Sequence, residues 1–376
     1  MMTLNGSIFH LVLTTAREAG FVTAGIASVP EPGSADDLAE RRQFESWIER
    51  GRAGEMEYLK RRDHAGRLLR SSLRIAMPWS RSVIVCVANY NSAAPRSLDP
   101  APKDTGWIAR YAWSGQSQTD GTLRPSDYHK VLLDRLRNVE QQLHGQLGGF
   151  ESRCYVDTGP VVERVYAKYA RVGWVGKNTC ILNQEQGSWL FLGVIVTSLE
   201  LPEEDRPLPA ADRCGSCRRC IEACPTGALT PYQMDASLCI AYLTIEKRGQ
   251  IPLELREQVG RQIFGCDICQ EVCPWNRKAP AGNDAGLAPR IELVNPALDW
   301  LADLDAAAFG RLFYGSPVKR TRLEGLRRNL AISMGNSRLA KFLPKLRQWA
   351  QSEDSVLADA AAWAIDRLSR DQPANE

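Results

Sequence analysis

Apolar and polar residues along the first part of the chain follow two different periods, which predict both helices and strands. Residues 7–20 carry apolar side chains at helical spacing, and residues 35–50 repeat this period with many charged positions between. Residues 21–27 form a predicted short strand. Residues 82–88 (SVIVCVA) are a β-branched run between turn formers, which is typical of a buried strand.

A second group of predicted elements surrounds Asp157. Ser126 is expected to cap a long amphipathic helix. Residues 153–156 form a predicted strand, and Pro160 is expected to begin a helix directly after it. Asp157 would then lie at the carboxyl end of a strand, where open α/β folds bind ligands, or it would only cap the helix. With the strand at 189–198, these elements predict an N-terminal domain of α/β or α+β class.

Composition divides the chain into three segments. Residues 1–205 hold the elements above, including residues 89–125, which are rich in Ser, Pro, Gly and Asp and predict a long loop. Pro and acidic residues at 201–212 predict a linker into residues 206–285, which carry most of the cysteines. Residues 286–376 are predicted to form an all-α, HEAT-like helical region.

Basic residues gather in two places, although the net charge of the whole chain is only +3. Residues 60–74 form the first, and a solvated helical face is the simplest interpretation. Residues 311–347 carry ten Lys or Arg against one acid, Glu324, and such clustering is typical of a surface that binds a phosphate backbone. The candidates for RNA contact are Lys319, Arg320, Arg322, Arg327 and Arg328.

Length and composition are those of an ordinary globular protein. The 376 residues allow about two or three domains, and 44% hydrophobic with 24% charged residues is an ordinary balance. No export signal is expected, and the longest apolar run, residues 189–197, has the length of a strand rather than of a membrane span. We therefore expect a cytoplasmic, monomeric protein without a membrane partner.

Eight of the 11 cysteines lie between Cys214 and Cys273. They follow the pattern C-x2-C-x2-C-x3-C-P, then a lone cysteine, then C-x2-C-x3-C-P, which is typical of bacterial ferredoxins with two [4Fe-4S] clusters. The last cysteine of each motif serves the other cluster in such proteins. One cluster is therefore assigned to Cys214, Cys217, Cys220 and Cys273, and the other to Cys224, Cys239, Cys266 and Cys269.

Disulfide bonds and zinc ligation are the two other uses that such cysteines can have. Disulfides need an oxidising compartment, for which the sequence gives no route. Structural zinc sites use C-x2-C pairs, but they do not require a third cysteine at the same gap followed by x3-Cys-Pro. Iron–sulfur clusters are therefore the favoured interpretation.

Several motifs, taken together, resemble epoxyqueuosine reductases. They cover most of the chain in the order of that family, and they include the whole cysteine array. The other matching pieces are GEMEYL (54–59), DYHKVL (127–132), YVDTGPVVER (155–164), GWVGKNTC (173–180), CIAYLTIE (239–246) and SPVKRTRLEGLRRNLAISMGN (316–336).

The resemblance implies a base-off cobalamin in residues 1–205, to which the two clusters deliver electrons one at a time. Reduced cobalt and a proton donor would convert the epoxide of epoxyqueuosine, in the anticodon loop of tRNA, into the alkene of queuosine. Asp157, in the VDTGP motif, is the implied proton donor, a role that needs a carboxyl pKa raised by burial. The electrons would come from an external flavodoxin- or ferredoxin-type donor or from a chemical reductant. The residues expected to line the cobalamin are Tyr128, His129, Asp157, Lys177, Asn178, Thr179 and Cys180.

The sequence departs from the family pattern in one place, where Ser114 to Ser126 separate the YAW segment from DYH. Asp127-x-His129 also lacks the glycine of the D-x-H-x-x-G motif of enzymes that bind cobalt through histidine, since Leu132 stands there. Two alternatives remain. A reductive dehalogenase would share both cofactors but has no use for a basic tail, and a non-catalytic electron-transfer module would need neither Asp157 nor a corrinoid.

Overall fold

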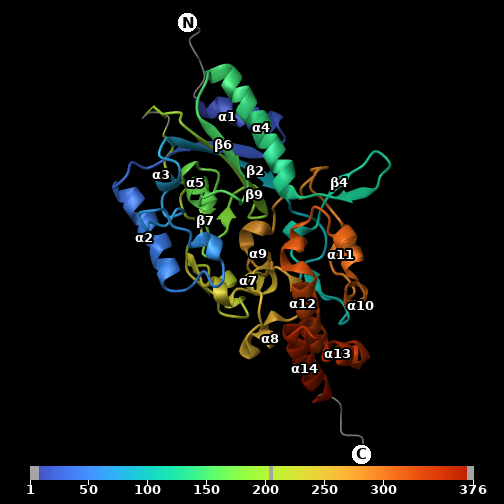
Figure 1. Cartoon of the computed structure of the whole chain (residues 1–376). Helices are drawn as coiled ribbons and strands as arrows, with labels where there is room; N and C mark the ends of the chain where they lie inside the picture. The colour runs from blue at the N-terminus through green and yellow to red at the C-terminus, as the bar shows by residue number, and fades with distance from the viewer. Residues whose placement is uncertain (1–7, 203–205, 371–376) are drawn as a thin grey trace, which may run out of the picture.

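A four-stranded antiparallel sheet organises the N-terminal part of the protein (Figure 1). The computed structural model of the whole chain describes residues 8–202 and 206–370. The strand order is β1-β2-β9-β6. Ile84 pairs with Ile195 at the centre of the sheet, and β6 extends the sheet beyond β9. The strands are β1 (Thr23–Ser28), β2 (Ser82–Asn89), β6 (Ser152–Tyr155) and β9 (Leu190–Thr197).

Helices cover both faces of this sheet, which explains why β2 is buried along its whole length. Successive side chains of a strand point to opposite faces. Ile84 and Cys86 pack with α1 (Ile8–Glu18) and α4 (Tyr128–Leu147), whereas the valines between them pack on the side of α5 (Glu163–Tyr169). Gly193 lets α4 approach closely, because a Cβ atom there would lie 2.9 Å from Leu136.

The structure confirms these strands but corrects three local predictions. Every pair in this sheet is antiparallel, so the N-terminal domain is α+β rather than α/β. Asp127, not Ser126, caps α4, since its carboxylate accepts a hydrogen bond from the His129 N–H. The helix after the Asp157 turn begins at Glu163 and not at Pro160. Residue 7, where the first helix was predicted to begin, lies outside the described residues.

The basic stretch at residues 60–74 is not a helical face, contrary to the simplest interpretation of its sequence. It follows the short turn η1 (Glu57–Leu59) and consists mostly of turns, with only the short helix α3 (Leu73–Ala76) at its end. The longer helix α2 (Ala35–Glu49), with its predicted amphipathic pattern, lies before it. Arg70 and Arg74 are both partly buried rather than free on the surface.

The predicted loop at 89–125 is ordered by contacts with distant parts of the chain. β3 (Trp107–Ile108) pairs in parallel with β12 (Gln262–Phe264) of the cysteine segment. The insertion at Ser114–Ser126 forms the hairpin β4–β5 (Ser114–Ser117 and Leu123–Pro125), and β13 (Ala288–Pro289) adds a third strand to it. The turn η2 (Arg110–Ala112) joins β3 to this hairpin.

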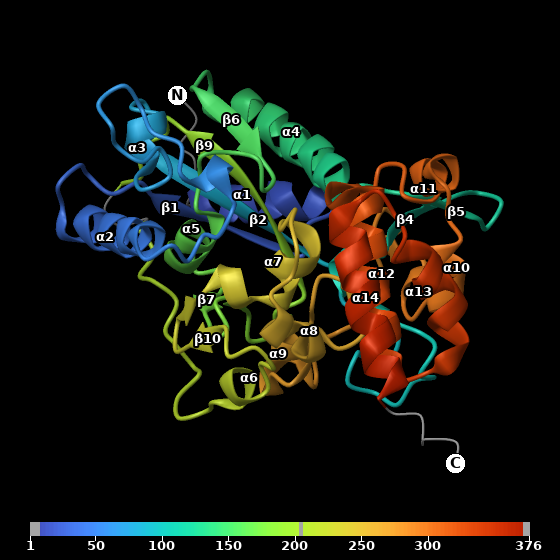
Figure 2. The ribbon, with the colours of Figure 1, turned by 60° about the horizontal axis from the view of Figure 1, so that its bottom comes forward.

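The cysteine segment consists of short elements joined by tight turns and lies between the sheet and the helical tail (Figure 2). Residues 201–212, predicted as a linker, contain no helix or strand in their described part. The small hairpin β7–β8 (Trp174–Val175 and Ile181–Leu182) precedes the segment. Besides β12, its elements are α6 (Arg219–Glu222), β10 (Leu229–Thr230), β11 (Gln233–Met234), η4 (Ala236–Leu238), α7 (Ile240–Ile245), α8 (Leu253–Val259), α9 (Ile268–Glu271) and η5 (Pro274–Asn276).

The tail is helical as predicted, and its central helix, α12 (Arg322–Ser337), is buried on most sides. α12 packs closely on α14 (Ser355–Ser369), because a Cβ atom at Gly335 would lie 2.9 Å from Ala364. The other elements of the tail are η6 (Ile291–Leu293), α10 (Leu298–Ala302), α11 (Ala306–Leu312), η7 (Pro317–Thr321), η8 (Ala340–Phe342) and α13 (Leu343–Trp349).

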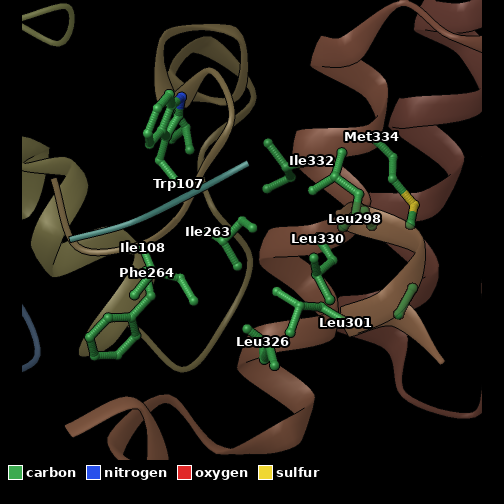
Figure 3. Packing of buried hydrophobic residues seen from close by; sticks show 14 of the residues in the cluster. Trp107, Ile108, Ile263, Phe264, Leu298, Leu301, Leu326, Leu330, Ile332 and Met334 are labelled. Carbon is green, nitrogen blue, oxygen red and sulfur yellow. The ribbon is translucent and has the colours of Figure 1, made fainter. Parts of the chain in front are cut away.

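The tail and the cysteine segment share one apolar core. Figure 3 shows Ile263 of β12 pointing towards the α12 side chains Leu326 and Leu330, while Phe264 and Trp107 of the same core lie on the side away from α12. This shared core fixes the position of the tail helices relative to the cysteine segment. Within residues 8–202 and 206–370, no helix combines the length and apolar composition that crossing a membrane requires.

Arg328 anchors α12 inside this interface and is only 1% exposed. Its guanidinium donates hydrogen bonds of 2.7 and 2.8 Å to the carbonyl oxygens of Leu243 and Lys247, and another of 2.8 Å to that of Gly249. Leu243 lies in the last turn of α7, where carbonyl oxygens lack partners within the helix, and Lys247 and Gly249 follow the helix. Burial lowers the Arg328 pKa to about 10. The prediction that Arg328 contacts RNA is therefore wrong, because the side chain is not at the surface.

Candidate functional site

The cysteines gather in two neighbouring sets of four. Cys220 lies within electrostatic reach of Cys214 and Cys217, and Cys273 within reach of Cys214 and Cys220. Burial first, and then these thiols, raise the Cys273 pKa to about 11. In the same way Cys266 lies near Cys224 and Cys239, and Cys269 near Cys239 and Cys266. This grouping agrees with the crossing of the motifs, but Cys180 also acts on Cys239, Cys269 and Cys273. The assignment of ligands to two clusters therefore stays a prediction.

The GKNTC stretch holds the cysteine segment against the sheet domain. The Lys177 ammonium group donates hydrogen bonds to the carbonyl oxygens of Gly215 and Cys217, and the Asn178 amide donates one of 3.3 Å to that of Cys269. The Cys180 thiol forms a hydrogen bond with the Cys269 thiol. Lys177, Asn178 and Cys180 thus contact the cysteine segment, whereas the family resemblance predicts that they line the cobalamin.

Asp157 lies in a strained turn and is held there by Tyr128. Its φ of 56° lies in the left-handed region, which a residue other than glycine adopts at a cost. The Tyr128 hydroxyl donates a hydrogen bond of 2.6 Å to Asp157 Oδ2. Tyr128 is itself stacked between His129 and Phe191, with both ring centroids 4.0 Å away. A precise arrangement of this kind, held by buried aromatic rings, is typical of a functional carboxyl group.

His129 forms a second connection to the same carboxyl group. Its Nδ1 lies 2.7 Å from Asp127 Oδ1, and its Nε2 lies 4.0 Å from Asp157 Oδ2. Asp157 does not cap a helix, because α5 begins six residues later. Its side chain is 55% exposed, so the burial expected of the proton donor is not found in this structure.

Side chains from all three parts of the chain surround Asp157. After burial, the charge of Asp157 contributes to raising the pKa values of Tyr58, Tyr111 and Glu163. Arg320 of the tail lies over the Tyr58 ring, with 5.2 Å between its guanidinium and the ring centroid, and pairs with Glu246 at 2.5 Å. The sequence motifs included Tyr58 and Glu163 but gave neither of them a role. Only the fold brings Tyr58 near Asp157, whereas Glu163 follows Asp157 by six residues.

A cavity of about 740 Å³ lies between α2, the turn after Asp157 and the cysteine segment. Its lining joins the aromatic rings of Phe44 and Trp47 with the guanidinium groups of Arg50, Arg52 and Arg70. Thr179 also lines it, alone among the four residues of the KNTC stretch. An oxygen of Glu163, Oε1, is buried at this cavity and has no hydrogen-bond partner among the described residues. The size and the mixed lining fit a large cofactor that carries amide and phosphate groups.

The basic residues predicted to bind RNA do not form one surface. Lys319, Arg320 and Arg322 are exposed where η7 meets α12. Arg327 is half-buried and donates a hydrogen bond of 3.1 Å to the Leu304 carbonyl oxygen, and Arg328 is buried as described above. The three exposed cations therefore cluster at the start of α12, where Arg320 also contacts Tyr58.

An iron–sulfur oxidoreductase requires sets of thiolates beside a cofactor-sized cavity and a positioned acid. The arrangement described above is that of this class. A family model described as a 4Fe-4S double cluster binding domain matches residues 213–276. A second, described as Epoxyqueuosine reductase QueG, matches residues 70–158.

The chain belongs to the epoxyqueuosine reductase family. It is 36% identical to the epoxyqueuosine reductase of Xanthomonas campestris pv. campestris, over 94% of each chain. It is 40% identical to that of Synechocystis sp., covering 81% of this chain and 98% of the relative. A crystal structure of a selenomethionine-labelled epoxyqueuosine reductase matches with a TM-score of 0.81 and 26% identity, over 96% of this chain and 90% of the other. A structure of the enzyme with an epoxyqueuosine-modified tRNA-Tyr stem loop gives a TM-score of 0.79 at 26% identity, over 96% of this chain and 89% of the other.

Exchange of single cysteines tests the division of the sulfur ligands. We expect Cys239→Ala to lower the iron content of reconstituted protein from about eight to about four atoms per chain, because one cubane loses a ligand. Cys180→Ala should keep about eight, since this thiol contacts a ligand but is not assigned as one. Iron and sulfide analysis with EPR of the reduced protein would measure both, and Cys86→Ala, in the core of β2, is the control. Loss of a cluster in Cys180→Ala, with none in Cys239→Ala, would exchange the two roles.

Proposed function

We propose that this protein reduces epoxyqueuosine to queuosine in the anticodon loop of tRNA. Electrons pass through two [4Fe-4S] clusters to a base-off cobalamin, and Asp157 donates a proton. The observation that carries this proposal is the position of Asp157, which the Tyr128 hydroxyl holds at a point shared by the sheet domain, the cysteine segment and the basic start of α12. An external one-electron donor is needed to reload the clusters.

The reaction removes one oxygen atom from the substrate. Both C–O bonds of the epoxide break, a C=C bond forms between the two carbons, and the oxygen leaves as water. Two electrons and two protons are consumed. A reduced cobalamin, when bound, supplies the electron pair that opens the epoxide, and the protein must supply protons and orientation.

The cavity beside α2 and α5 is the proposed cobalamin site. Arg50, Arg52 and Arg70 would hold the phosphate of the cofactor, and Phe44 and Trp47 would pack on its apolar parts. Thr179 lines this cavity, while its neighbours Asn178 and Cys180 contact Cys269. A few covalent bonds and the hydrogen bond between Cys180 and Cys269 therefore connect the cavity with the cluster assigned to Cys224, Cys239, Cys266 and Cys269, and this cluster is the proposed final electron donor.

The other cluster is the proposed entry point for electrons. Exposed residues separate Cys214, Cys217 and Cys220 along the chain, whereas buried residues flank Cys266 and Cys269. The set that contains Cys220 thus lies nearer to solvent, where an external donor can reach it. Electrons would then pass from this outer cluster to the inner one and on to the cavity.

Asp157 is the proposed proton donor because substrate can reach it. Its side chain is 55% exposed, its charge acts on Tyr58 and Tyr111, and Arg320 lies over the Tyr58 ring. The Tyr128 hydroxyl would orient the acid and stabilise the carboxylate that remains after the proton has left. A solved Bacillus subtilis relative, with a TM-score of 0.78 and 26% identity over 96% of this chain and 90% of the other, has an aspartate-containing catalytic loop swung out of the active site. Motion of the Asp157 turn would likewise release its strained φ.

The proposed RNA surface is the exposed basic cluster Lys319, Arg320 and Arg322. Arg320 of this cluster lies over Tyr58, on which the charge of Asp157 acts, so phosphates bound there would bring an extruded base towards the acid. The solved relative with a bound tRNA stem loop supports this substrate.

Replacement of Asp157 tests the proton transfer. We expect Asp157→Ala to lower the turnover of epoxyqueuosine tRNA by about 100-fold or more, because a positioned general acid contributes about that factor. Absorbance and EPR spectra of both clusters should not change. Asp120→Ala, an exposed aspartate at the tip of the β4–β5 hairpin, is the control and should keep full activity. Full activity of Asp157→Ala would refute the role of this residue.

Charge reversal at the start of α12 tests the RNA surface. We expect replacement of Lys319 and Arg322 by Glu to weaken tRNA binding and to make its salt dependence shallower, by about 0.7 to 0.9 in log–log slope for each lost phosphate contact. Titrations at several salt concentrations would measure the slope. Arg370→Glu makes the same change at the far end of α14, where the side chain is 75% exposed, and should bind normally. If Arg370→Glu weakened tRNA binding as much as the change at Lys319 and Arg322, the assignment of the RNA surface to the start of α12 would be wrong.

A further inference from the structure

Trp174 carries a buried indole N–H group that has no hydrogen-bond partner in the described part of the chain. The residue is only 4% exposed. A buried tryptophan normally finds an acceptor for its N–H group, because an unpaired donor in the interior destabilises the fold. The position of this group therefore needs an explanation beyond the contacts of the polypeptide.

The hairpin β7–β8 fixes the Trp174 ring in one place. Trp174 pairs with Leu182 across the hairpin. A Cβ atom at Gly173 would lie 2.5 Å from the Leu182 carbonyl oxygen, and one at Gly176 would lie 2.5 Å from Leu182 Cδ1. Glycine is therefore needed on both sides of β7, because any larger residue would push the two strands apart.

The Trp174 ring packs among cysteines of the outer cluster, which is the cluster assigned to Cys214, Cys217, Cys220 and Cys273. Trp174 and Cys273 belong to one small buried core, against which Cys214 and Trp275 pack. The two indole rings meet edge to face, with their centroids 5.0 Å apart. Trp174 thus lies on the ligands of one cluster.

The Lys177 side chain holds the loop of the outer cluster beside this ring. Its ammonium group donates a hydrogen bond of 3.0 Å to the Cys217 carbonyl oxygen and another to that of Gly215. Because Lys177 lies only three residues after Trp174, the hairpin and the loop between Cys214 and Cys217 form one rigid unit. The indole N–H group therefore has a fixed place relative to the Cys214 sulfur.

The chemistry of sulfur explains why the N–H group has no partner in the protein alone. Burial raises the Cys214 pKa, whereas the Lys177 backbone N–H and the Trp174 indole N–H lower it. A neutral thiol is a weak acceptor, but a thiolate that binds iron carries negative charge and accepts a hydrogen bond well. The Trp174 ring also lines the cavity beside α2, but its Nε1 atom is buried and closed to a ligand there.

We propose that the Trp174 indole N–H donates a hydrogen bond to the Cys214 sulfur of the outer cluster and thereby raises the reduction potential of this cluster. Reduction adds one electron to the cubane and increases the negative charge on its sulfur atoms. A donor at a sulfur therefore stabilises the reduced form more than the oxidised form, and no proton is transferred.

This inference rests on the assignment of Cys214 as a cluster ligand, and not on the identity of the substrate. The family model for a double 4Fe-4S cluster domain over residues 213–276 supports that assignment. In the proposed electron path, a raised potential makes the outer cluster easier for an external donor to reduce. Trp174 is thus a residue that tunes the entry point for electrons, and it takes no part in the chemistry of the epoxide.

The test is a redox titration of Trp174→Phe, which keeps an aromatic ring but removes the N–H group. Protein with both clusters, without cobalamin or tRNA, would be reduced stepwise and followed by EPR. At the midpoint potential of the outer cluster in the unchanged protein, the ratio of reduced to oxidised outer cluster should fall about tenfold, which is about 59 mV for one electron. The other cluster should keep its potential. Trp300→Phe, the same change at an exposed site in α10, is the control and should alter neither potential. Unchanged potentials in Trp174→Phe would overturn the proposal.

Pulsed EPR gives a second readout, which decides the question even if Trp174→Phe loads its clusters poorly. Protein labelled with nitrogen-15 in its indole rings should show a nitrogen-15 hyperfine coupling to a reduced cluster, because a hydrogen bond to sulfur carries spin density to the donor nitrogen. Trp275→Phe, which alters the neighbouring ring, should keep this coupling. Absence of the coupling in labelled, cluster-loaded protein would overturn the inference. A failure to form queuosine would contradict the proposed function alone, since neither measurement uses the substrate.

Discussion

The contact of Arg328 and Asn329 with the end of α7 is the interaction on which the relation between clusters and tail depends. Arg328 binds the carbonyl oxygens of Leu243, Lys247 and Gly249, and the Asn329 amide binds those of Thr244 and Ile263 at 2.8 Å. Cys239 immediately precedes α7, and Cys266 follows β12. Because a buried arginine has no alternative partners in an apolar core, this network fixes two predicted cluster ligands relative to α12.

The same contact places the basic start of α12 beside Asp157. Arg320 lies two residues before α12 and reaches Tyr58 of the sheet domain, while Lys177 and Asn178 bind the cysteine segment through hydrogen bonds. The sheet domain, the cysteine segment and the tail thus meet around one carboxyl group. In the proposed reaction the sheet domain supplies protons and a cofactor cavity, the cysteine segment supplies electrons, and the tail supplies a surface for RNA.

Features that depend on local sequence could be predicted, and features that depend on distant partners could not. The cysteine spacing and the β-branched run of β2 carry their meaning within a few residues. The direction of strand pairing does not, and the partner of β3 lies about 150 residues further along the chain. Arg328 and Arg322 look alike in sequence, yet only the tertiary fold buries one and exposes the other. The position of Tyr58 near Asp157 could not be predicted for the same reason, since no local spacing relates the two residues.

The most direct test of the central claim is conversion of the substrate by the reconstituted protein. Anaerobic protein with both clusters would be incubated with cobalamin, a one-electron reductant and epoxyqueuosine-containing tRNA, and the nucleosides analysed by mass spectrometry. The account predicts that queuosine, which lacks one oxygen atom of the substrate, forms only when cobalamin and reductant are both present. Queuosine formed without cobalamin, or none formed by protein fully loaded with clusters and cobalamin, would contradict it.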